Sequence, residues 1–107
     1  MYHALTVDVE DYFQVSAFAE NISPKDWSNW PCRVERNTQE LLALFAEKNC
    51  KATFFVLGWI AERYPELVRE IQANGHEIAS HGMSHQLIYN QPIEVFKQET
   101  LRSKSLL

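Results

Sequence analysis

Several residue types are scarce in this sequence, and each scarcity excludes a class of protein. Only two cysteines occur, Cys32 and Cys50, which are too few for a disulfide framework and too far apart for a C-x-x-C metal or redox motif. We therefore expect free thiols in a cytoplasmic protein. With three glycines and four prolines in 107 residues, no linker, repeat or low-complexity segment is present, so a single domain is expected.

Runs of basic residues and long apolar runs are also missing. The formal net charge is −4 at pH 7, and no cluster of Lys or Arg provides the positive surface that binds nucleic acid. No apolar stretch has the length needed to span a bilayer. The N-terminal segment MYHALTVDVEDYF reaches acidic residues too early for a secretory signal. We therefore expect no nucleic-acid partner and no membrane span.

The sequence does contain a regular alternation of strand and helix patterns. In residues 4–10, Leu5, Val7 and Val9 alternate with polar residues, as in a strand with one buried face. The segments that follow are an irregular aromatic-rich loop or lid (12–36), a helix (37–49), a strand (51–58), a helix (64–75), a strand (76–80) and a helix (91–107). This order predicts an α/β fold with a parallel sheet and right-handed helical crossovers.

Local signals predict where the helices begin. Asn37 is expected to cap the first helix, with Glu40 at the capping-box spacing. Pro65 and Pro92 open the next two helices, and Gly75 follows the end of the second one.

The C-terminal end of the sequence indicates that residues 1–107 are a fragment. The last helix reaches Leu107 without a stop signal. A sheet of three parallel strands is unusually small and leaves unpaired edges. We therefore expect residues 1–107 to be part of a longer protein, with open edges through which the fragment self-associates.

Side chains suited to catalysis follow two of the predicted strands. Asp8, Glu10 and Asp11 end the first strand, and His81 and His85 follow the third in the segment SHGMSH. Catalytic residues of βα folds gather at the carboxyl ends of strands, so the two groups are expected to meet. Two imidazoles and a carboxylate suit Zn²⁺ or another divalent transition metal, and clustered carboxylates need a cation or another functional reason.

Strand alternation favours Glu10 over Asp11 as the carboxylate ligand. Asp8 and Glu10 share a face, about 6.6 Å apart along the strand, whereas Asp11 points away. If the strand ends before residue 10, this argument fails and Asp11 is the substitute.

The remaining histidines are not assigned to this site. His76 and His3 lie at the beginnings of strands, away from His81, so capping or solvated roles are favoured. Glu77 is a structural partner available to His76.

Three segments together resemble one family. TVDVED, ATFFVLG and NGHEIASHGMSH are similar, in this order, to motifs of the polysaccharide deacetylase domain (NodB homology, carbohydrate esterase family 4). The D-x-E form of the first motif resembles the subgroup of allantoinase-like and peptidoglycan deacetylase-like proteins, some linked to exopolysaccharide biosynthesis. Gly82 stands where the H-[ST]-x-x-H metal motif usually has Ser or Thr.

The resemblance implies a fold and a reaction. Residues 1–107 would be the N-terminal part of the domain, the first three βα units of a distorted, TIM-barrel-like (β/α) barrel of the NodB type. Asp8 takes the place of the catalytic base, Glu10 that of the metal-binding carboxylate, and His81 and His85 those of the imidazole ligands. The implied enzyme is a hydrolase, with zinc as the expected metal, that removes N-acetyl groups from a polysaccharide of the exopolysaccharide or peptidoglycan type through a metal-activated water.

Two alternatives remain open at this point. A hydrolase of a small cyclic amide, as in allantoinase-like relatives, uses the same residues. A non-catalytic carbohydrate-binding module would keep the fold without turnover. The family's later motifs, an Arg-containing loop and a Leu-x-His segment that supplies the general acid, are absent from these residues, so the fragment alone is expected to be inactive.

Overall fold

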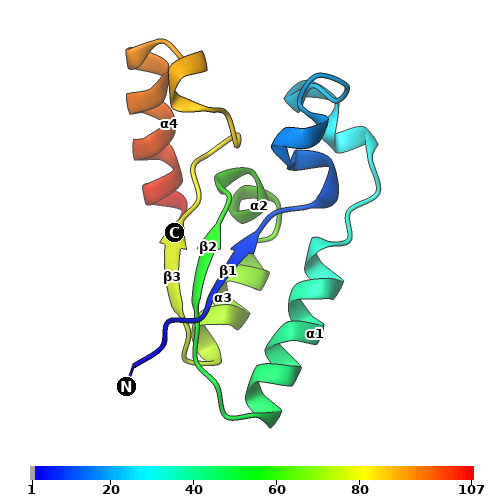
Figure 1. Ribbon diagram of the computed structural model, residues 1–107, viewed down its shortest axis with the longest axis vertical. Coiled ribbons are helices and arrows are strands. Elements are labelled where there is room, and N and C mark those ends of the chain that lie inside the picture. Colours follow the sequence, from blue (N-terminus) through cyan, green and yellow to red (C-terminus); the bar gives the residue numbers. More distant parts are fainter. Residues whose placement is uncertain (1) are drawn as a thin grey trace.

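The sheet is parallel, as the alternation of strands and helices predicts. A computed structural model describes residues 2–107 and contains three strands in the order β1 (Thr6–Val9), β2 (Thr53–Val56) and β3 (Glu77–Ser80). The register pairs Asp8 with Phe55 and Phe55 with Ala79. The helices that connect the strands lie beside and behind the sheet (Figure 1). The predicted α/β class is therefore confirmed, with strands shorter than the predicted segments.

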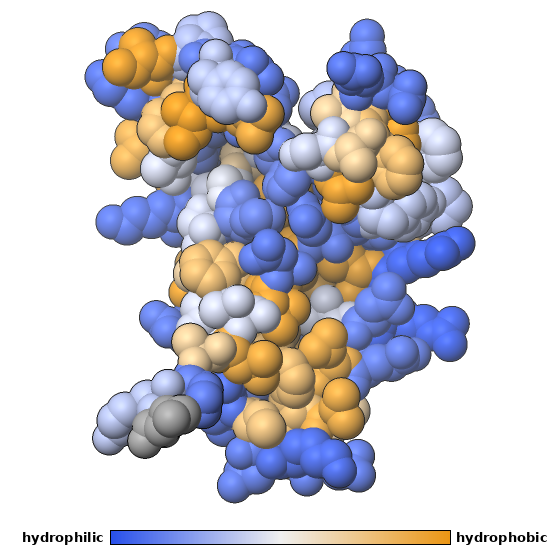
Figure 2. All heavy atoms as spheres, in the orientation of Figure 1, coloured by the Kyte–Doolittle hydropathy of each residue, from blue (hydrophilic) through white to orange (hydrophobic). Residues whose placement is uncertain are grey.

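Alternation along the strands separates a covered face from an open one. Val9, Phe54 and Val56 are buried, and Val7 is half-buried. They pack in one core with residues of α1 (Val34–Glu47) and α3 (Pro65–Ala73). The opposite face is open, and Figure 2 shows apolar side chains at the surface in front of the sheet.

The helix boundaries differ from the predictions in two places. Helix α1 begins at Val34, and Asn37 lies inside its first turn with its N–H bonded to the Arg33 carbonyl, so the predicted Asn37 cap is wrong. A short helix that was not predicted, α2 (Gly58–Arg63), begins one residue after the end of β2. Helices α3 and α4 (Ile93–Leu106) begin at Pro65 and directly after Pro92, as expected.

The aromatic-rich segment between β1 and α1 is more ordered than a plain surface loop. It contains three 3₁₀ helices, η1 (Tyr12–Gln14), η2 (Ser16–Phe18) and η3 (Pro24–Asn29). Phe13 and Trp27 are buried. Their rings form an aromatic cluster with Trp59, with centroids 5.6–6.3 Å apart. This cluster fixes the segment against α2.

Two further expectations concern cysteines and membranes. Cys32 and Cys50 are both free thiols, as expected. Within residues 2–107, every helix is too short or too polar to cross a bilayer.

Candidate active site

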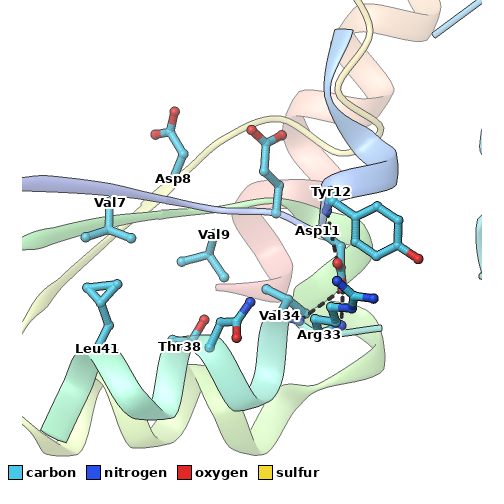
Figure 3. A pocket seen from close by; sticks show the side chains of 11 residues that line it. Val7, Asp8, Val9, Asp11, Tyr12, Arg33, Val34, Thr38 and Leu41 are labelled. Carbon is cyan, nitrogen blue, oxygen red and sulfur yellow. Dashed lines mark hydrogen bonds between the residues drawn. The ribbon is translucent and has the colours of Figure 1, made fainter. Parts of the chain in front are cut away.

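The carboxylates in β1 and directly after it lie in different surroundings. The side chain of Asp8 is exposed and points away from Val7 and Val9, which face α1 (Figure 3). Strand β1 ends at Val9, one residue before Glu10. The alternation argument for Glu10 therefore does not extend to this residue, and its position has to be taken from its contacts.

Asp11 has a structural role. Its carboxylate accepts hydrogen bonds from the N–H groups of Tyr12 (2.9 Å), Arg33 (2.7 Å) and Val34 (3.0 Å). Two of these bonds cap α1 from a residue far away in the sequence, and Figure 3 shows them at the beginning of the helix. Asp11 is 3 % exposed. Because these bonds occupy its carboxylate, Asp11 is not placed to substitute for Glu10.

Glu10 lies against both histidines of the SHGMSH segment. Its Oε2 atom is 2.9 Å from Nε2 of His85 and 3.5 Å from Nε2 of His81. The two imidazole rings are 4.9 Å apart between centroids. One potential ligand atom from each of the three residues lies within 4.8 Å of the other two.

The polar atoms of this cluster lack the partners that buried groups normally have. Glu10 Oε2 and His81 Nε2 are buried and make no hydrogen bond of acceptable geometry within residues 2–107. Buried polar atoms are seldom left without a partner, because their desolvation is costly. One divalent cation would satisfy both. Two nitrogens and one carboxylate oxygen form a common zinc donor set, and bonds of about 2.0–2.2 Å to one ion are compatible with the observed separations.

The loop that carries the histidines has an unusual backbone. The His81 N–H bonds to the Val56 carbonyl, which continues the β2–β3 pairing to the first histidine. Gly82 has φ +79° and His85 has φ +56°, both in the left-handed region. A side chain at residue 82 would be strained there, which explains glycine at a position where Ser or Thr is usual. Strained residues of this kind are often found at functional sites.

Helix α2 supports this loop through close backbone contact. The Gly58 N–H donates to the Gly82 carbonyl at 2.7 Å, and the Trp59 N–H donates to the Met83 carbonyl at 3.1 Å. A Cβ atom on Gly58 would overlap Met83 Sδ and lie 3.1 Å from Met83 Cα. Glycine at residue 58 is therefore needed for the loop to approach.

Helix α4 supports the same loop from the other side. Ser103 is fully buried, and its hydroxyl lies 2.6 Å from that of Ser80 and 3.2 Å from the Gly82 carbonyl. Glu99 accepts a hydrogen bond from Ser84 at 2.7 Å. Sequence reasoning missed these supporting residues, because isolated serines and a single glutamate on a helix carry no motif.

The histidines outside the cluster behave differently from each other. His3 is exposed, in agreement with a solvated role. His76 is 7 % exposed, so a solvated role for it is wrong. Its Nδ1 accepts the Ala52 N–H at 3.1 Å, and burial lowers the pKa of His76 below the usual value. Glu77 accepts a hydrogen bond from Thr53.

Sequence comparison connects this geometry to known proteins. The family model for polysaccharide deacetylase matches residues 26–107, a range that includes both site histidines and leaves out β1. A chitooligosaccharide deacetylase of Bradyrhizobium is 36 % identical over 70 residues, covering 64 % of this chain and 32 % of the relative. A peptidoglycan-N-acetylglucosamine deacetylase of Bacillus cereus is 34 % identical over 67 residues, covering 63 % of this chain and 32 % of the relative.

Structural comparison agrees with the sequence comparison. A crystal structure of a peptidoglycan N-acetylglucosamine deacetylase superposes with a TM-score of 0.70 at 25 % identity, covering 97 % of this chain and 38 % of that one. A family 4 carbohydrate esterase from Streptomyces lividans, in complex with acetate, gives a TM-score of 0.71 at 22 % identity, covering 98 % and 43 %. The chain spans about a third of the length of the Bradyrhizobium and Bacillus cereus deacetylases named above. The match over residues 26–107 shows that the chain belongs to the polysaccharide deacetylase family.

Proposed function

We propose that the protein containing this chain is a metal-dependent deacetylase of N-acetylated glycans. The observation that carries the proposal is the cluster of Glu10, His81 and His85, in which Glu10 Oε2 and His81 Nε2 are buried without hydrogen-bond partners within residues 2–107. The names of the relatives support the substrate class, because chitooligosaccharides and peptidoglycan both contain N-acetylglucosamine.

In this proposal, Glu10, His81 and His85 hold one zinc ion. When bound, the ion supplies Lewis acidity that activates a water molecule and polarises the amide carbonyl. Glu10 would supply a carboxylate oxygen, and His81 and His85 would supply the Nε2 atoms that face it.

Asp8 is the proposed general base. It lies two residues before Glu10 and is exposed at the open face of the sheet, where a substrate can reach it. A carboxylate at this place can take a proton from the attacking water. Collapse to amine and acetate also requires an acid for the leaving nitrogen. We propose that this acid comes from the part of the domain that residues 1–107 do not span.

Metal analysis of the purified full-length protein tests the ligand assignment. We expect about one zinc per chain, and loss of the metal in a His81→Ala/His85→Ala variant. The exposed His3 provides the matched control, because His3→Ala removes an imidazole outside the cluster. Equal metal content in all three proteins would refute the assignment.

Acetate release from N-acetylglucosamine oligomers tests the role of Asp8. We expect Asp8→Asn to keep its zinc and to lose about 10²-fold or more in turnover, the usual scale for a general base. Activity within a few-fold of the parent protein would show that another group takes the proton.

We also propose that the isolated segment 1–107 is inactive and self-associates. Strands β1 and β3 are both edge strands of the sheet formed by residues 2–107, and unpaired strand edges favour pairing with another chain. Light scattering and acetate release, measured with and without the downstream part of the protein, test this proposal. A monomeric, fully active segment would contradict it.

A further inference from the structure

The segment between β3 and α4 carries both proposed histidine ligands, but its backbone fixes only the first of them. In Figure 1 the chain leaves β3, passes through η4 (Ile88–Asn90) and returns as α4, so that the segment lies beside the helix. Backbone hydrogen bonds hold residues 81–83 against β2 and α2. Within residues 2–107, the backbone of residues 84–86 forms no hydrogen bond with other backbone groups. His85 therefore lies just beyond the part of the loop that the backbone fixes.

The conformation of His85 nevertheless needs outside support. Its φ of +56° lies in the left-handed region, which residues with a side chain rarely adopt. Such a conformation persists only where the surrounding contacts hold it. Gly82 has no side chain to contribute, and the Met83 side chain packs next to Gly58. Side-chain contacts of the residues closest to His85 must therefore hold it in place.

Glu99 of α4 provides these contacts with both of its carboxylate oxygens. Oε1 accepts a hydrogen bond from the Ser84 hydroxyl at 2.7 Å, and Oε2 accepts one from the Gln91 amide at 2.7 Å. The amide of Gln91 also reaches Oε1 of Gln86 at 3.5 Å. Hydrogen bonds to a charged carboxylate are stronger than those between neutral groups. One half-buried residue thus fastens the chain on both sides of His85.

We propose that Glu99 is a positioning residue of the metal site. Through Ser84 and Gln91 it holds the left-handed backbone of His85, so that Nε2 of His85 faces Glu10. Ligands that are already held in place lose less conformational entropy on binding. Glu99 acts through its two partners and is not part of the three-residue metal cluster. The inference rests on the proposed function, because it assumes that the cluster binds zinc.

The zinc affinity of the full-length protein tests this role. In competition with a chromogenic chelator, Glu99→Ala should bind zinc about 10–100-fold more weakly than the parent, the usual effect of losing a residue that orients a metal ligand. Glu94→Ala is the matched control. It removes a glutamate from the same helix, whose carboxylate lies 3.5 Å from the exposed Lys97. The zinc affinity of this control should equal that of the parent.

A conservative variant separates positioning from the loss of a charge. In Glu99→Gln, the amide oxygen can accept the Ser84 hydroxyl, and the amide nitrogen can donate to Gln91 once the Gln91 amide turns its oxygen toward it. We expect this variant to recover most of the affinity that Glu99→Ala loses.

Ser84→Ala provides a second, independent variant. It should weaken zinc binding in the same direction, because it removes the hydrogen bond directly before His85. The double variant Ser84→Ala/Glu99→Ala should bind zinc no more weakly than Glu99→Ala, since both changes break the same bond. If Glu99→Ala does not fold, Ser84→Ala decides the matter.

Cobalt(II) in place of zinc gives a signature that a purely structural role would not change. The visible absorption of bound cobalt depends on the arrangement of its ligands. At saturating cobalt, Glu99→Ala should therefore alter the spectrum of the parent, and Glu99→Gln should restore it. Urea unfolding of the metal-free variants measures the stability of the fold separately.

The outcomes separate this proposal from the proposed function. Parent-like zinc affinity and cobalt spectra in both Glu99→Ala and Ser84→Ala would refute the positioning role, even if the metal-free variants are less stable. Normal acetate release by the parent would then leave the deacetylase function standing. An equal loss of zinc affinity in Glu94→Ala would also refute the positioning role.

The opposite pattern is equally informative. Weaker zinc binding and an altered spectrum in Glu99→Ala, with recovery in Glu99→Gln, would support the positioning role. If the parent then releases no acetate from any N-acetylated glycan, the deacetylase function is refuted and the positioning role stands. A parent protein that binds no zinc would refute both proposals.

Discussion

Replacement of Gly58 by alanine should weaken metal binding as well as lower the stability of the fold. The added methyl group would overlap Met83 Sδ and lie 3.1 Å from Met83 Cα. Met83 is 8 % exposed and stands between the two proposed histidine ligands, so it has little room to move away. The loop must therefore shift relative to α2, and the hydrogen bond between the Gly58 N–H and the Gly82 carbonyl must lengthen.

Two magnitudes follow for Gly58→Ala. Overpacking of a buried contact costs about 1–3 kcal/mol in the free energy of unfolding. Displacement of groups that orient metal ligands typically lowers metal affinity about 10–100-fold. We therefore expect a lower unfolding midpoint in urea and, in competition with a chromogenic chelator, a zinc affinity reduced by at least about 10-fold.

Gly75→Ala is the matched control for this prediction. Gly75 has φ +84°, and the atoms nearest to its added Cβ would be those of the flexible Lys51 side chain, at 3.2–3.8 Å. Alanine there should cost about 1–2 kcal/mol through the left-handed backbone. Gly75 lies at the end of α3, away from the loop, so zinc affinity should not change. The reasoning is refuted if Gly58→Ala binds zinc like the parent, or if both variants lose zinc affinity equally.

Two further predictions concern buried polar residues outside the cluster. Asp11→Ala removes the acceptor for the N–H groups of Tyr12, Arg33 and Val34, so urea unfolding should show a loss of about 2–3 kcal/mol. The zinc content should stay that of the parent, and its loss without a loss of stability would make Asp11 a ligand after all. His76→Asn addresses pH: burial lowers the pKa of His76 in the folded state, so its contribution is complete above the unfolded value of about 6.5 and is lost as pH falls below it. Between pH 7 and pH 5, the free energy of unfolding measured with urea should decrease less in His76→Asn than in the parent. An equal decrease in both proteins would contradict this.

The parts of the fold that follow from local patterns could be predicted from the sequence. The alternation of Val7 and Val9 indicated a strand with one buried face, and Pro65 and Pro92 marked the beginnings of helices. The beginning of α1 could not be predicted, because its cap is Asp11, a residue 22 positions before Arg33. Local capping rules therefore selected Asn37.

Prediction of the candidate site had a similar limit. The parallel order of the strands was sufficient to expect Asp8, Glu10 and the two histidines near the carboxyl ends of the strands. Alternation alone could not place Glu10, because β1 ends at Val9. The cluster also depends on contacts between distant elements, such as those of Gly58 and Ser103 with the loop. These contacts have no signature in the sequence.

The position of Asp11 has a consequence for how this domain can change. One carboxylate holds the N–H groups of Tyr12 and of Arg33 and Val34, so it fastens both ends of the intervening segment at a single point. The exposed parts of that segment can therefore vary while its anchor, and Glu10 beside it, stay in place, provided that Phe13 and Trp27 keep their packing on Trp59. A foreign segment grafted between residues 12 and 33 that keeps Phe13 and Trp27 should then leave the metal content of the protein unchanged.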